Sequence, residues 1–168
     1  MMMEGLYGRS GDWAYRVAGA IATTSLINAE NVEQRWQRIL HIQQQLAGEQ
    51  VALSDEVNQS EQTTNFHNRA IAWLLYSAGY LYCDAMEACD VYTRQCSTLL
   101  NTIELATLGA TLAAGGVNPL THKRVLQADN VPYILAEMMM EGLYGRSGDW
   151  AYRVGLPGKS GVGGGILA

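Results

Sequence analysis

The chain has 168 residues, of which 16 are acidic and 11 basic, so its formal net charge at pH 7 is −5. This length is sufficient for one domain with a substantial core, and the few scattered basic residues argue against nucleic acid as the main partner, because neutralising phosphates requires clustered cations. The three cysteines, Cys83, Cys89 and Cys96, lack the spacing of a zinc site or of a disulfide framework, so we interpret them as small apolar residues of a reducing compartment.

From Ala18 to Leu143 the spacing of apolar residues predicts one helix after another. Asn31 and Asn101 stand where N-cap residues are expected, each followed three residues later by Gln34 or Glu104, which is the pattern of a capping box. The predicted helices cover residues 18–27, 31–46, 67–81, 89–100, 102–114, 121–127 and 132–142, with a weak helical stretch at 55–57 and a loop at 58–65.

The pattern changes after Gly142. Residues 149–154 alternate as in a strand, residues 155–158 form a Pro/Gly turn, and residues 159–168 resemble a second strand, so we expect a hairpin. Because a hairpin alone is marginally stable in water, we expect more strands after Ala168. The expected organisation is a helical domain at 18–143 and a hairpin remnant of an α/β domain at 144–168.

Residues 1–17 repeat residues 138–154 letter for letter. A single exact pair is not a repeat array, so we do not expect a solenoid. Three interpretations stay open for the first copy. It docks where another segment of the fold normally packs, it competes with the second copy for one place, or it pairs with another subunit and makes a homo-oligomer, as in domain swapping.

The longest apolar run, Ala70 to Tyr82, is shorter than the roughly 20 residues that cross a bilayer. The N-terminus has no basic segment followed by an apolar run, so we see no signal peptide. We therefore expect a cytoplasmic protein without a membrane partner.

Two motifs near the C-terminus are candidates for chemistry. Residues 156–165 (LPGKSGVGGG) are not a Walker A loop, because Arg153 occupies the position of its first Gly, and we expect no nucleotide cofactor. Lys159-Ser160-Gly161 matches the Lys-Thr/Ser-Gly element of serine β-lactamases and penicillin-binding proteins, which borders their active site. The alternative is a Gly-rich strand or bulge.

Three further polar positions have a structural and a functional interpretation. Tyr144 is either a packing residue or a proton carrier beside a nucleophile. Glu61 and Asn68 either cap a helix or converge on the polar end of a small ligand. The three histidines have no ligand spacing, and we expect no metal site.

Four segments closely resemble bacterial glutaminases of the serine β-lactamase-like superfamily, and together they extend from Ala18 almost to the last residue. They are AGAIATTSLIN at 18–28, SEQTTNFHNRAIAWLLYSAG at 60–79, TLAAGGVNPLT at 111–121 and MMMEGLYGRSGDWAYRVGLPGKSGVGGGIL at 138–167. The resemblance implies that the fold is mainly α, the helical domain of an α+β fold with a short β-hairpin remnant.

The resemblance also implies the hydrolysis of L-glutamine to L-glutamate and ammonia through a serine acyl-enzyme, without metal or cofactor. Glu61 and Asn68 match residues that hold the amino-acid end of glutamine, and Tyr92 matches another substrate contact. Tyr144 matches a tyrosine that exchanges a proton with the serine, and the backbone N–H of Val162 matches part of the oxyanion hole.

Two departures from the family pattern affect the expected activity. The family's nucleophile belongs to a Ser-x-x-Lys motif, and no serine of this chain has a lysine three residues later. The family also has a substrate-binding Asn directly before Ala-Gly-Ala-Ile, where this chain has Val17. We therefore expect the chain alone to be inactive on glutamine; the alternative is a non-catalytic helical module for packing or self-association.

Overall fold

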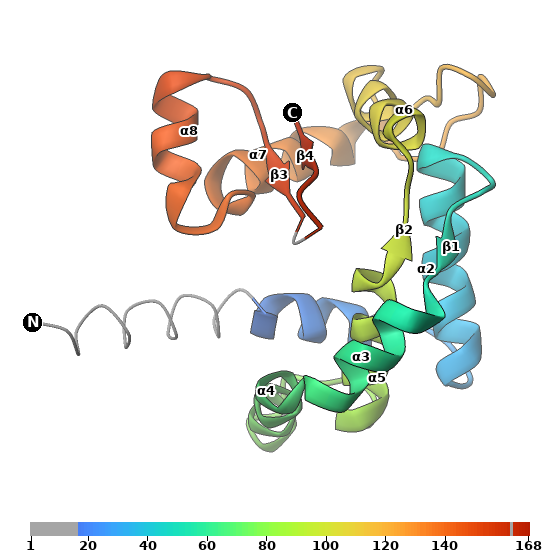
Figure 1. The fold of residues 1–168 in the computed structure, drawn as a ribbon, viewed down its shortest axis with the longest axis vertical. Coiled ribbons are helices and arrows are strands. Elements are labelled where there is room, and N and C mark those ends of the chain that lie inside the picture. The colour runs from blue at the N-terminus through green and yellow to red at the C-terminus, as the bar shows by residue number, and fades with distance from the viewer. Residues whose placement is uncertain (1–16, 162) are drawn as a thin grey trace, which may run out of the picture. The chain divides into compact units, whose positions relative to one another are not determined.

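The computed structural model describes residues 17–161 and 163–168 and is mainly helical, which confirms the expected fold class (Figure 1). The first copy of the repeat, up to residue 16, lies outside the described residues. Contacts divide the chain into two compact units. The first unit holds the described residues up to 41 and residues 52–99, and the second unit holds residues 42–51 and those from 100 onward. The expected boundary near residue 143 stays a prediction.

The first unit is built from helices and one short antiparallel ladder. Its elements are a helix at 17–25, the first part of α2 (Val32–Ala47), β1 (Ala52–Leu53), α3 (Asp55–Thr64), α4 (Phe66–Ser77), α5 (Ala85–Cys96) and β2 (Thr98–Leu99). In the ladder Ala52 pairs with Leu99 and Leu53 with Thr98. The ladder joins the segment before α3 to the segment after α5.

Local sequence explains where several of these helices begin and end. The Asp84 carboxylate accepts the N–H groups of Met86 and Glu87 at the start of α5, at 2.8 and 3.1 Å. Gly79, with φ of +77°, follows the end of α4 in a conformation that favours glycine.

The loop predicted at 58–65 is wrong, because α3 continues to Thr64. The Ser54 hydroxyl accepts the Val57 N–H at 3.2 Å, and two acidic residues occupy the first turn, where the helix dipole favours negative charge. A well-capped polar sequence thus forms a helix that its lack of apolar residues did not reveal.

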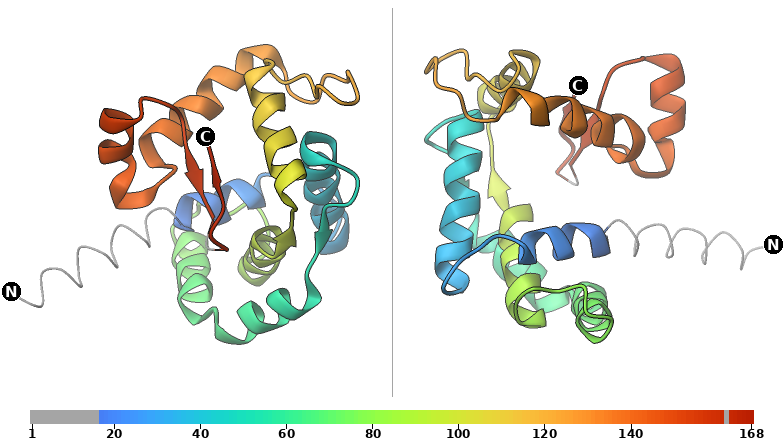
Figure 2. Two further views of the ribbon diagram at one scale, coloured as in Figure 1. Left: turned by 45° about the horizontal axis from the view of Figure 1, so that its top comes forward. Right: turned by 180° about the vertical axis from the view of Figure 1, so that it is seen from behind.

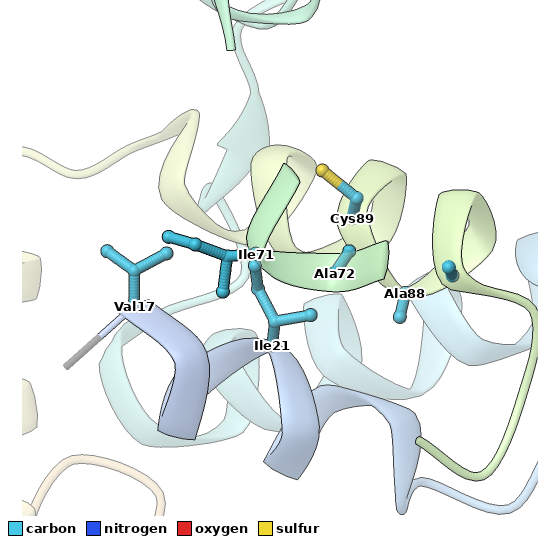
Figure 3. Packing of buried hydrophobic residues seen from close by; sticks show 7 residues of the cluster. Val17, Ile21, Ile71, Ala72, Ala88 and Cys89 are labelled. Carbon is cyan, nitrogen blue, oxygen red and sulfur yellow. The ribbon is translucent and has the colours of Figure 1, made fainter. Parts of the chain in front are cut away.

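The core of the first unit lies between the helix at 17–25, α4 and α5 (Figure 3). Val17 and Ile21 of the first helix pack with Ile71 and Ala72 of α4 and with the inner face of α5. A second cluster joins α2 to α5 through Trp36, Ile39 and Val91. All the residues named in both clusters are buried.

The second unit combines helices with a two-stranded hairpin (Figure 2). Its elements are the last part of α2, α6 (Thr102–Ala113), the 3-10 turn η1 (Ala128–Asn130), α7 (Val131–Glu141), the 3-10 turn η2 (Tyr144–Arg146), α8 (Ser147–Arg153), β3 (Lys159–Ser160) and β4 (Ile166–Leu167). The predicted capping box of α6 is confirmed: Asn101 Oδ1 accepts the Glu104 N–H at 2.9 Å, and Glu104 Oε2 accepts the Asn101 N–H at 2.8 Å.

Two predictions about this unit are wrong. Residues 121–127 are not a helix, because the Asn118 side chain accepts the N–H groups of Leu120 and Thr121 and a bridge pairs Val117 with Arg124. Residues 149–154 do not form a strand, since α8 extends over Ser147–Arg153.

The hairpin exists but is shorter and lies later in the chain than predicted. Lys159 pairs with Leu167 and Ser160 with Ile166, so both strands fall in the segment predicted as one strand. In the part of the chain that the structure describes, no helix is long and apolar enough to cross a membrane.

Candidate functional site

Glu61, Asn68 and Tyr92 lie on three consecutive helices of the first unit, α3, α4 and α5 (Figure 1). α4 and α5 are joined by a short connection and pack against each other as a helical hairpin. Asn65, directly before α4, donates from Nδ2 to Thr93 Oγ1 at 3.0 Å. This bond brings the start of α4, which holds Asn68, to the C-terminal half of α5, which holds Tyr92. Glu61 lies on α3, the helix that directly precedes α4.

Asn68 occupies a core-facing position of α4. It precedes Ile71, Ala72 and Leu75 by three, four and seven residues, so it shares their helix face. Its Oδ1 atom is buried and finds no hydrogen-bond donor among the described residues. An amide therefore stands at a position where the helix pattern calls for an apolar side chain.

Tyr92 and Glu61 differ in their surroundings. Tyr92 is half-buried and packs against the core cluster, on the α5 face that it shares with Ala88 and Cys89. Glu61 is exposed in the second half of α3. It neighbours Gln62, whose side chain donates from Nε2 to Asp90 Oδ1 of α5 at 2.6 Å.

Sequence reasoning missed Gln62 and Asn65 because it assigned both to a polar loop. The available signal was weak: a polar run, SEQTTN at 60–65, directly before an apolar helix. Nothing in that run shows that two of its amides reach α5.

Tyr144 belongs to the second unit and has a strained backbone. Its φ of +56° is in the left-handed region, which is uncommon for a residue with a side chain. Ser147 supports this turn, because its hydroxyl donates to Tyr144 O at 2.9 Å and accepts the Leu143 N–H at 3.1 Å. The turn links α7 to α8, so the predicted helix-to-strand junction is a junction between two helices.

Two glycines bring Lys159 to Tyr144. A Cβ atom on Gly142 would lie 1.8 Å from Gly158 O, and one on Gly158 would lie 2.8 Å from Leu143 Cδ1. This close backbone approach places the Lys159 ammonium 5.2 Å from the centroid of the Tyr144 ring. The approach depends on the absence of a side chain at both glycines.

Two positions complete the predicted set. Val162 lies outside the described residues. Val17 directs its apolar side chain into the core of the first unit, at the position where the resemblance predicts a substrate-binding Asn (Figure 3).

Other features of the described residues do not coincide with these positions. A groove lies between α6 and β4 in the second unit and is lined mainly by apolar and small residues; none of the predicted site residues lines it. Within residues 17–161 and 163–168, no three His, Cys, Asp or Glu side chains gather in a way that could hold a metal ion.

The family model for glutaminase matches residues 17–168. Glutaminase 1 of Escherichia coli O6:H1 is 99% identical over 151 residues, which are 90% of this chain and 49% of that relative. The glutaminase of Bordetella avium is 72% identical over 151 residues, 90% of this chain and 48% of the relative. The chain therefore belongs to the glutaminase family, and it spans about half the length of these relatives.

Solved structures agree with this assignment. The probable glutaminase ybaS superposes with a TM-score of 0.88 at 99% identity over 89% of this chain and 48% of its own. A Bacillus subtilis glutaminase, solved as a covalent complex with 5-oxo-L-norleucine, superposes with a TM-score of 0.86 at 33% identity over 89% of this chain and 52% of its own.

Proposed function

We propose that the chain carries part of the substrate site of a glutaminase, and that Glu61, Asn68 and Tyr92 bind the amino-acid end of L-glutamine. Tyr144 is the proton carrier of the parent reaction, the hydrolysis of L-glutamine to L-glutamate and ammonia. The Bacillus subtilis relative was solved after reaction with 6-diazo-5-oxo-L-norleucine, an amino-acid analogue, which supports an amino acid as the ligand class.

The observation that carries the proposal is the buried Oδ1 atom of Asn68. This atom has no donor among the described residues and lies on a helix face that is otherwise apolar. A buried acceptor without a donor lowers stability. The N–H group of a bound amino acid would supply the missing hydrogen bond, with the Glu61 carboxylate as its charge partner.

We further propose that these 168 residues alone do not hydrolyse glutamine. The serine acyl-enzyme needs a nucleophile, and no serine of the sequence lies three residues before a lysine. Loss of a nucleophile typically lowers kcat by several orders of magnitude, and the remaining rate comes from binding and oxyanion stabilisation.

Calorimetry with L-glutamine and L-glutamate tests the binding part of this proposal. We expect weak binding that Glu61→Gln abolishes, because the charge partner of the ligand's amino group is lost. An assay of ammonia release tests the second part. Hydrolysis above the buffer rate that disappears in Tyr144→Phe would contradict the expected inactivity.

A second candidate function, self-association, has one observation in its favour. On α4, four large apolar or aromatic side chains are more than half exposed: Phe66, Trp73, Leu74 and Tyr76. Clustered apolar side chains of this kind are typical of interaction surfaces.

Sedimentation at increasing concentration tests self-association. We expect Trp73→Glu to weaken any association, whereas the same charge at exposed Leu120 of the second unit leaves it unchanged. A strict monomer at high concentration excludes this candidate.

A further inference from the structure

A network of buried and half-buried polar side chains connects the α3–α4 junction to α5. Asn65, only 6% exposed, lies between the two helices and donates from Nδ2 to Thr93 Oγ1 at 3.0 Å. Gln62, on the last turns of α3, donates from Nε2 to Asp90 Oδ1 at 2.6 Å. The Arg94 Nε atom in turn lies 3.0 Å from Asp90 Oδ2.

The hydrogen bonds of this polar network form one consistent set of donors and acceptors. The Thr93 hydroxyl donates its single proton to Cys89 O at 2.9 Å and accepts from the Asn65 amide. The Asp90 carboxylate only accepts, which fixes Nε2 of Gln62 toward it.

Asn65 bonds to Thr93 instead of capping the start of α4. Asn is among the preferred N-cap residues, yet Asn65 makes no side-chain bond to the start of α4. Its Oδ1 atom is also buried without a donor among the described residues. A residue that breaks a local rule and leaves a buried acceptor unpaired is expected where function requires a defined geometry.

The connected residues neighbour the proposed ligand-binding side chains. Glu61 is adjacent to Gln62, Asn68 lies one helical turn after Asn65, and Tyr92 is adjacent to Thr93. We propose that Asn65 and Gln62 are positioning residues, which hold the α3–α4 junction against α5 so that Glu61, Asn68 and Tyr92 keep one arrangement. This inference rests on the proposed function, because it assumes that those three residues bind the ligand.

Thr93→Val is the variant that tests the proposal, and Thr24→Val is its matched control. Thr93 and Thr24 are 2% and 3% exposed, and each hydroxyl donates to the carbonyl four residues earlier, at 2.9 Å. Of the two, Thr93 also accepts from a side chain, Asn65. The two variants therefore lose the same helical bond and differ in the connection to Asn65.

Two measurements on the full chain report separately on the Asn65–Thr93 connection and on ligand binding. Amide hydrogen exchange over residues 61–68 reports whether the junction is held, and L-glutamine affinity by calorimetry reports whether the site is formed. We expect Thr93→Val to raise the exchange rates and to weaken the affinity about tenfold each, the usual consequence of leaving a buried donor unpaired. Thr93→Ser restores both values, and Thr24→Val changes neither.

Each outcome decides one of the two proposals. Equal exchange and equal affinity in Thr93→Val and Thr24→Val would overturn the positioning role. Should Thr93→Val fail to fold, Gln62→Met removes the bond to Asp90 at a half-buried position and provides the same comparison. Absence of glutamine binding by the unmodified chain, or binding unaffected by Glu61→Gln, overturns the proposed function instead, while the exchange rates still report on the connection.

Discussion

At the scale of single residues, Asn68 places a polar group where the packing of α4 favours an apolar one. Its amide occupies a core-facing position of α4, and its Oδ1 atom has no donor among the described residues. The same face holds Ile71, Ala72 and Leu75, which are apolar. An apolar residue would suit this position better for packing, which agrees with the proposed binding role of the amide.

We expect Asn68→Leu to raise the free energy of unfolding by about 1 kcal/mol, because it removes a buried acceptor without a partner. The same variant loses glutamine binding. Urea denaturation and calorimetry measure the two effects. A loss of stability without any change in binding would contradict the proposed role, and Asn68→Asp provides a control of similar size.

The cysteines differ in environment and therefore in reactivity. Cys89 is buried in the core of the first unit and Cys96 is exposed. Burial raises the pKa of the Cys89 thiol, which keeps it protonated and weakly nucleophilic. We expect N-ethylmaleimide to label Cys96 first and Cys89 last at pH 8, as measured by mass spectrometry of peptides.

The raised pKa of Cys89 also predicts how stability depends on pH. The folded state holds this proton more tightly than the unfolded state, so the contribution is complete below the unfolded pKa, about 8.5, and is lost as pH rises through the folded pKa. Cys89→Ala should therefore flatten the decline of stability between pH 8 and 10. Urea denaturation at each pH measures the free energy of unfolding. If this free energy declines with pH as steeply in Cys89→Ala as in the unmodified protein, the thiol does not contribute.

At the scale of elements, glycines decide how α7, α8 and the hairpin meet. Gly142, at the end of α7, approaches Gly158 so closely that a Cβ atom would lie 1.8 Å from its carbonyl oxygen. The Ser160 N–H donates to Gly142 O at 3.0 Å, so the hairpin is bonded at the same point. Tyr144 and Lys159 owe their proximity to this junction.

We expect Gly142→Ala to lower the free energy of unfolding by about 1–3 kcal/mol, because the added methyl group overlaps backbone that cannot move freely. Gly148→Ala is the matched control. Gly148 lies within α8, and a Cβ atom there meets nothing within 4 Å, so we expect a gain of about 0.5–1 kcal/mol. Thermal unfolding of both variants checks the difference; equal effects would contradict the close approach.

At the scale of the whole molecule, the two units differ in how much apolar surface they bury. Among the described residues, ten apolar side chains of the first unit are buried, against four of the second unit. Both core clusters belong to the first unit. The second unit contains a two-stranded hairpin, which is marginal by itself.

We therefore expect the first unit to resist local opening better than the second. Amide hydrogen exchange should show slower exchange in α4 and α5 than in α7 and α8, because opening free energies follow the amount of buried apolar contact. Substituting Ile21 by Ala, which removes a fully buried side chain, should lower the protection of α4 and α5. Longer protection in α7 than in α5 would contradict this prediction.

The sequence alone identified the family and most helices. Apolar spacing predicted α2, α4, α6 and α7 to within a few residues, and Asn101 with Glu104 predicted the capping box that the structure contains. These features depend on residues within a turn of each other, so local rules are sufficient. The absence of a Ser-x-x-Lys motif is likewise a property of the letters.

Only the tertiary structure decided the hydrogen bonds between residues distant in sequence and the burial of each side chain. Asn65 turns its amide to Thr93, 28 residues away, although its local position favours a helix cap. Residues 149–153 belong to a helix where alternation predicted a strand, with Trp150 Nε1 donating to Leu156 O. Val17 and Val154 end the two identical copies, yet they are 7% and 45% exposed. Burial and partner choice depend on the three-dimensional neighbours, which identical local letters do not determine.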